Sequence, residues 1–209
     1  MDGRFVTAFV LPEEWEILGY RVGPFTLRHY LTMLAIDSPI LTGEVKDVRP
    51  EDVIIFLRIC SMDNAFVALK EPTMADKWRQ AKLEFNMNLM VRTVITIKEY
   101  VGTGLSAPKT FTKEDGVKQF KRENIPGVLG IATSLMARLN MDAEDAWRLT
   151  PGQAIWYLTA FAISEGAEIR ILTTQEEAKA ESEREFLLRK QKEALSFIKE
   201  RMKNRGANR

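Results

Sequence analysis

The stretch from Thr150 to Gly166, TPGQAIWYLTAFAISEG, restricts the fold more than any other part of the sequence. Thr150 suits the N-cap of a helix, Pro151 suits its first position, and Gln153 can close a capping box. Gly166 is typical of the residue that follows a helix. Apolar residues cover two adjacent faces between these signals, so the stretch predicts a helix over 151–165. This helix is either buried between two others or partly a docking face, since Trp and Tyr concentrate binding energy at interfaces.

Similar signals predict further helices near 25–36, 50–60, 73–101 and 128–139. The longest opens with Thr73 and Asp76 in an N-cap pattern and contains no proline or glycine before Gly102. Its apolar side chains are Trp78, Ala81, Phe85, Leu89 and Val91 through Ile97. A short turn, capped by Asp142 and running through Trp147, is expected before the helix over 151–165.

Two segments lack the helical pattern. Residues 4–24 are rich in Val, Phe, Ile and Tyr and are broken by proline and glycine, which predicts one or two short strands. Residues 102–127 contain four glycines and two prolines, which predicts an irregular loop with a short helix near 113–122. The expected fold is mainly α: a helical domain over 1–173 with a minor N-terminal β element, followed by a long charged C-terminal helix over 174–209.

The C-terminal segment has its acidic residues early and its basic residues late, which matches a helix dipole. Four of its apolar residues fit one seam, although Gln191 interrupts the heptad pattern: Leu188, Leu195, Ile198 and Met202. These apolar side chains need to be buried away from water, and a partner helix or a second copy of the chain would provide the surface that buries them.

The composition is that of an ordinary globular protein, with 45% hydrophobic and 28% charged residues, so we expect the chain to fold. A formal net charge of +1 provides no overall field that would attract nucleic acid or an anionic membrane. The single cysteine excludes an internal disulfide, and the N-terminal apolar run is too short for a signal peptide. No stretch approaches the ~18 apolar residues that span a bilayer, so we expect a cytoplasmic protein.

Catalytic motifs are missing from the sequence. It contains no phosphate-binding loop, no zinc-protease motif and no nucleophile elbow. The glycines of the stretch 102–106 are interpreted as a helix stop. His29 is interpreted as a surface or boundary residue, and Cys60 is interpreted as an inert buried thiol. We therefore expect no enzymatic activity, no metal and no cofactor.

A helical DNA-binding module is an alternative, because residues 131–158 superficially resemble helix, turn, helix. A recognition helix needs Arg, Lys, Asn or Gln side chains that reach base edges. The second helix offers only Gln153, and Asp142, Glu144 and Asp145 in the preceding turn repel phosphate. Nucleic-acid binding is therefore not expected.

The segment DAEDAWRLTPGQAIWYLTA resembles the W-x-[ML]-T-P-x-E helix start of small helical tail assembly chaperones of tailed bacteriophages and prophages. The upstream segment VGPFTLRHYLTMLAIDSPIL is similar to the opening helix of those proteins. Gln153 stands where that pattern often has glutamate, and the two segments cover about a quarter of the chain.

The resemblance implies a nonenzymatic chaperone that acts in the host cytoplasm and binds the tape-measure and tail-tube proteins during virion assembly. A structural component of the phage particle, of connector or scaffold type, fits the same features. In either case the expected contacts are protein partners or self-association, without nucleic acid or membrane. The expected partner-binding residues are Trp147, Trp156, Tyr157, Leu188, Leu195, Ile198 and Met202.

Overall fold

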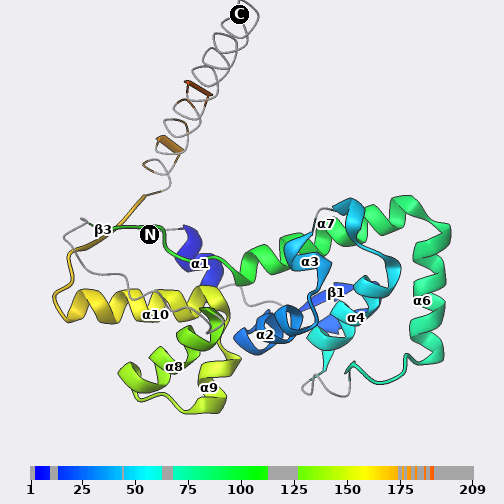
Figure 1. The fold of residues 1–209 in the computed structure, drawn as a ribbon, viewed down its shortest axis with the longest axis horizontal. Coiled ribbons are helices and arrows are strands. Elements are labelled where there is room, and N and C mark those ends of the chain that lie inside the picture. The colour runs from blue at the N-terminus through cyan, green and yellow to red at the C-terminus, as the bar shows by residue number, and fades with distance from the viewer. Residues whose placement is uncertain are drawn as a thin grey trace, which may run out of the picture. The chain divides into compact units, whose positions relative to one another are not determined.

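The computed structural model describes residues 3–9, 14–43, 45–62, 68–112 and 127–173, together with Glu176, Ala178, Lys179, Ser182, Phe186, Arg189 and Lys190. These residues are mostly helical, with a small antiparallel sheet near the N-terminus, which confirms the predicted fold class (Figure 1). The helices are α1 (Gly3–Phe9), α2 (Leu27–Ala35), α3 (Pro39–Thr42), η1 (Val45–Asp47), α4 (Pro50–Ser61), α6 (Met74–Phe85), α7 (Met87–Gly104), α8 (Gly127–Leu139), α9 (Ala143–Arg148) and α10 (Pro151–Ser164). The strands are β1 (Trp15–Ile17), β2 (Tyr20–Val22), β3 (Thr110–Thr112) and β4 (Ile169–Ile171).

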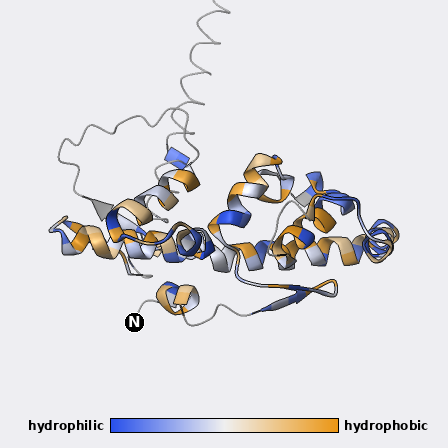
Figure 2. Ribbon diagram, turned by 90° about the horizontal axis from the view of Figure 1, so that it is seen from below, coloured by the Kyte–Doolittle hydropathy of each residue, from blue (hydrophilic) through white to orange (hydrophobic). Residues whose placement is uncertain are grey.

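The chain divides into two compact units, Met1–Pro108 with Thr112–Ile169 and Lys109–Phe111 with Arg170–Arg209. The first unit has two apolar clusters. One joins the β1–β2 hairpin to α4, α6 and α7, and the other joins α2 to α8, α9 and α10. Apolar and polar residues are interspersed along these helices, as expected for helices that bury one face (Figure 2).

In the second unit, β3 pairs with β4, and the Leu172 amide donates a hydrogen bond of 3.0 Å to the Lys109 carbonyl. A capping box between Thr173 and Glu176 opens the C-terminal helix, and the seven described positions from Glu176 onward have helical backbone. Leu188, Leu195, Ile198 and Met202 lie outside the described residues.

The predicted helix over 151–165 is α10, and its predicted ends are confirmed. The Thr150 amide donates to Gln153 Oε1 and the Gln153 amide donates to Thr150 Oγ1, both at 3.1 Å. Gly166 has φ +89°, a conformation that glycine adopts without strain, and its amide donates back to the Ile163 carbonyl. The predicted helices at 50–60 and 128–139 are likewise present as α4 and α8.

The first part of the β-rich segment 4–24 is not a strand, because the chain forms helix α1 over Gly3–Phe9. In a helix, Phe5 and Phe9 project from one face, so both can contact a single neighbour. They pack edge-on against Trp156 and Tyr157 of α10, each at 5.5 Å between ring centroids. The hairpin of β1 and β2 supplies the strands that the sequence predicts within 4–24.

The prediction of one continuous helix over 73–101 is wrong. Asn86 has a non-helical backbone, with φ −132° and ψ 89°, and it ends α6 and begins α7. Its side chain accepts a hydrogen bond of 3.0 Å from the Leu89 amide, so it serves as the N-cap of the second helix. The chain can therefore turn at this residue, although no proline or glycine is present.

The predicted irregular loop over 102–127 starts too early, since α7 continues to Gly104 and β3 occupies Thr110–Thr112. The short helix predicted near 113–122 lies outside the described residues. The turn predicted at Asp142 is α9, but the Asp142 side chain makes no capping hydrogen bond.

Candidate protein-binding surface

The outer face of α6 carries an apolar stripe, called the α6 stripe: Met74, Trp78, Ala81 and Phe85. These four positions fall within roughly 60° of the helix circumference. Phe85 is 91% exposed and Trp78 is 62% exposed, whereas Leu83 on the opposite face is buried. Single exposed apolar side chains are ordinary, but a row of them on one face is typical of an interaction surface.

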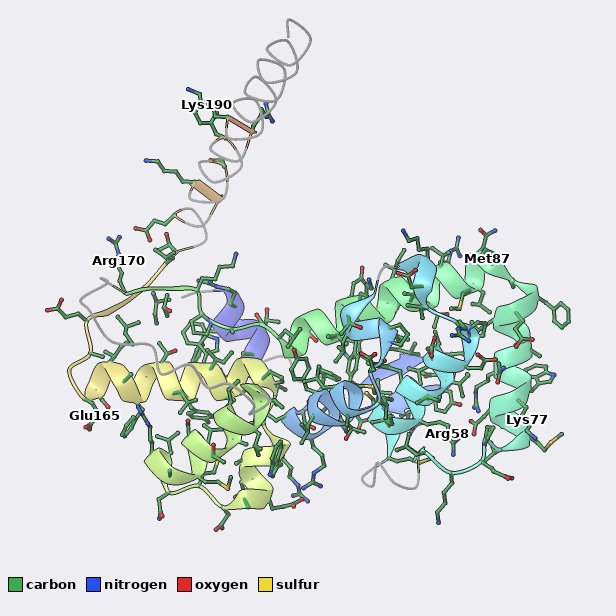
Figure 3. All side chains as sticks on the ribbon, viewed as in Figure 1. Arg58, Lys77, Met87, Glu165, Arg170 and Lys190 are labelled. Carbon is green, nitrogen blue, oxygen red and sulfur yellow. The ribbon has the colours of Figure 1, made fainter. Side chains whose placement is uncertain are left out.

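A second row of apolar side chains, called the α7 stripe, follows directly after Asn86: Met87, Val91 and Ile95. All three are exposed, Met87 to 72%, while Val94, Ile97 and Val101 on another side of α7 are buried in the core. Met87 marks the corner at which the two helices meet (Figure 3). The stripes therefore cover consecutive helices at one edge of the first unit.

Charged side chains border both stripes. Lys77, Lys82 and Glu84 lie beside the α6 stripe, and the Lys82 ammonium sits over the Trp78 ring at 3.5 Å from its centroid. Beside the α7 stripe, Arg92 is exposed and Lys98 is half-buried. Such a charged border is the pattern of a protein interface, where the apolar centre excludes water and the rim remains polar.

A buried polar cluster fixes the orientation of α6. Asp76, on the inner face of the helix, accepts a hydrogen bond from the Tyr20 hydroxyl and one of 2.8 Å from the Thr73 amide. The Asp76 carboxylate also lies 3.5 Å from Arg58 Nε and 3.7 Å from an Arg79 nitrogen. Arg58 projects from α4 (Figure 3). Both Arg58 and Asp76 are buried. Because Asp76 faces Arg58 and Tyr20, Trp78 and Phe85 project from the other side of α6, where both are exposed.

The protonation states within this cluster follow from its contacts. Desolvation raises the pKa of Asp76, but the hydrogen bonds from Tyr20 and Thr73 and the charge of Arg58 outweigh it, so the net pKa is lowered. Burial, followed by the contact with Asp76, raises the pKa of Tyr20 above its ordinary value. Asp76 is therefore ionised and Tyr20 is neutral at pH 7.

Trp156 and Tyr157, two of the expected partner-binding residues, lie together beneath α1. Trp156 is only 9% exposed, and its indole Nε1 is buried with no hydrogen-bond partner within the described residues. Tyr157 is 41% exposed, with its ring against Phe9. The side chain of Gln153 donates a hydrogen bond of 2.9 Å to the Ala8 carbonyl and so helps to hold α1 in place.

Trp147, the third expected residue, lies elsewhere, on α9. It is half-buried against the second apolar cluster and lines an open cleft of about 630 Å³. Glu144 lies in the same cleft and bridges two guanidinium groups, at 2.8 Å from Arg28 and 3.2 Å from Arg148. The hydrogen bond and charge of Arg28 lower the pKa of Glu144.

The thiol of Cys60 and the imidazole of His29, the side chains of the sequence most typical of catalytic or metal sites, have structural surroundings. Burial raises the pKa of the Cys60 thiol to about 12, so the nucleophilic thiolate is disfavoured. His29 Nδ1 accepts a hydrogen bond from the Thr26 amide at 3.2 Å and completes the cap of α2. Within the described residues, no group of three or more His, Cys, Asp or Glu side chains could hold a metal ion.

Comparisons with family models, curated proteins and solved structures found no match. In the described part of the chain, no helix is both long enough and apolar enough to cross a membrane.

The sequence alone does not identify the two stripes as surface. Its pattern places Trp78 and Phe85 on an apolar helix but does not specify which face of that helix is buried. The available signal is Leu83, which lies opposite Trp78 and Phe85 and gives the helix two apolar faces.

Proposed function

We propose that this protein is a nonenzymatic protein-binding factor that acts as a phage tail assembly chaperone in the host cytoplasm. The observation that supports this proposal is the α7 stripe, because three successive turns of one helix present apolar side chains to solvent. An assembly chaperone requires such a surface, since it must hold apolar parts of its clients until they reach their final partners.

The occupant that we propose for the α7 stripe is an amphipathic helix of a client protein with acidic residues beside its apolar face. Such helices dock through anchors three or four residues apart, and the α7 stripe presents its side chains at four-residue steps. Arg92 and Lys98 outnumber Glu99 at the border of the stripe, so the border favours an acidic client. The tape-measure and tail-tube proteins are the clients implied by the resemblance around Trp147 and Thr150.

Co-expression of the full chain with tape-measure and tail-tube proteins tests the function. We expect the chaperone to copurify with at least one of these proteins and to be missing from purified virions analysed by mass spectrometry. Abundant copies in finished particles would instead favour a structural component of the particle.

The client contact is tested by the double substitution Val91→Glu with Ile95→Glu. We expect about tenfold or greater loss of client affinity, because two of the three apolar residues of the stripe become acidic and repel an acidic client. Affinity is measured by calorimetry with the captured client. Leu34→Glu, a change at another exposed apolar residue outside the stripe, is the matched control and should leave affinity unchanged. Equal affinities of all three proteins for the client would rule out the α7 stripe as its binding surface.

A further inference from the structure

We infer that the α6 stripe is a self-association surface on which α6 of a second copy of this chain packs antiparallel. The stripe residues are separated by four, three and four positions, from Met74 to Trp78, Ala81 and Phe85. This spacing is that of the a and d positions of a coiled coil. It also reads the same in both directions, which is the requirement for an interface related by a two-fold axis.

The side chains are complementary in size under this symmetry. An axis between Arg79 and Gln80 places Trp78 opposite Ala81 of the second copy, and Met74 opposite Phe85 of the second copy. The largest side chain of the stripe thereby meets the smallest, so two bulky indoles do not compete for the same space. A parallel arrangement in register would place Trp78 against Trp78 of the second copy and would lose this fit.

The bordering charges are complementary in the same arrangement. Lys77 and Glu84 are seven residues apart and occupy the same side of the α6 stripe. In the antiparallel pair, Lys77 faces Glu84 of the second copy, and the symmetry repeats this ion pair. The parallel arrangement would instead place Lys77 beside Lys82 of the second copy, which is repulsive.

The position of α6 allows a second copy to approach. α6 forms one edge of the first unit, and both views show its outer side free of other elements of that unit (Figures 1 and 2). Its inner side is fixed by Asp76 and Leu83, so pairing requires no rearrangement of the core. The α7 stripe is not used in this contact and stays open for a client.

Sedimentation velocity of the purified full chain, from about 1 μM to about 1 mM, tests the pairing, since a contact limited to one helix dissociates in this range. We expect a reversible dimer, and about tenfold or greater weakening by Trp78→Lys. Ile95→Lys, an equally apolar-to-basic change on the α7 stripe, is the control and should leave the dimer intact. Because no client is present, this result does not depend on the proposed function.

Charge reversal tests the antiparallel register. Lys77→Glu and Glu84→Lys should each weaken the dimer by about two- to tenfold, because each variant places like charges opposite one another. An equimolar mixture of the two variants should recover dimerisation, since the side chains that face each other in the mixed dimer carry opposite charges at both contacts. Both changed residues are exposed, so circular dichroism and thermal unfolding should match the unsubstituted protein.

Three outcomes would overturn the inference: a monomer throughout the concentration range, a dimer unaffected by Trp78→Lys, or reversed variants that do not recover on mixing. The second outcome would assign self-association to another surface, such as the C-terminal helix.

Discussion

Replacing Asp76 with alanine is expected to lower the free energy of unfolding by about 3 to 5 kcal/mol, the usual cost of removing one partner from a buried ion pair. Asp76 and Arg58 are each only 4% exposed, so the substitution leaves the Arg58 charge in the interior without its carboxylate. Tyr20 loses its hydrogen-bond acceptor, and the N-terminus of α6 loses the 2.8 Å hydrogen bond between the Thr73 amide and Asp76. Urea unfolding followed by circular dichroism provides the measurement.

Asp52→Ala is the matched control. Asp52 accepts the same kind of capping hydrogen bond, 2.8 Å from the Arg49 amide at the start of α4, but it has no ion pair with a buried arginine in the described structure. Its replacement should cost about 0.5 to 2 kcal/mol, the range for loss of a cap. If both substitutions cost the same, Asp76 is only a helix cap, and the buried cluster does not hold α6 in place.

The same cluster predicts a pH dependence. The pKa of Asp76 is lower in the folded protein than in the unfolded chain, so its contribution to stability is fully present above the unfolded value of about 3.9. That contribution is lost as the pH falls through the folded pKa, when the carboxylate gains a proton. The difference in unfolding free energy between the unsubstituted protein and Asp76→Ala should therefore shrink as the pH is lowered below about 4.

Replacing Trp156 with alanine is expected to cost about 3 to 5 kcal/mol of unfolding free energy, because it leaves a cavity beneath α1. The Trp156 ring packs edge-on against Phe5, so α1 loses one of the two aromatic contacts that hold it on α10, the other being Phe9 against Tyr157. Urea unfolding gives the size of the loss, and proteolysis near the N-terminus should accelerate as α1 separates from α10.

Trp156→Phe separates packing from hydrogen bonding. It keeps an aromatic ring against Phe5 and removes an indole N–H that is buried without an acceptor in the described residues. Its cost should be clearly smaller than that of the alanine change. If Trp156→Ala leaves stability unchanged and abolishes client binding, then Trp156 belongs to a docking face of α10, the alternative that the sequence also predicts. In that case a client displaces α1 from this face when it binds.

Local signals in the sequence determined where most helices begin and end. Thr150, Gln153 and Gly166 delimit α10, and Thr73 with Asp76 starts α6, because capping needs only residues within one turn of each other. The helical spacing of apolar residues likewise indicated the mainly α fold. These features depend on hydrogen bonds that the backbone makes with its nearest neighbours.

Where local signals conflicted, the tertiary structure decided which conformation a segment adopts and which face of a helix is buried. The apolar segment around Phe5 has strand propensity, yet it is helical because Phe5 and Phe9 must contact α10 together.

For α6, hydrophobicity alone does not specify whether the side that holds Trp78 and Phe85 or the side that holds Leu83 is buried. The first of these sides is exposed because Arg58 and Tyr20, distant in sequence, pair with Asp76 on the other side. A buried charge must have its partner nearby, and only the folded chain brings the partners of Asp76 together.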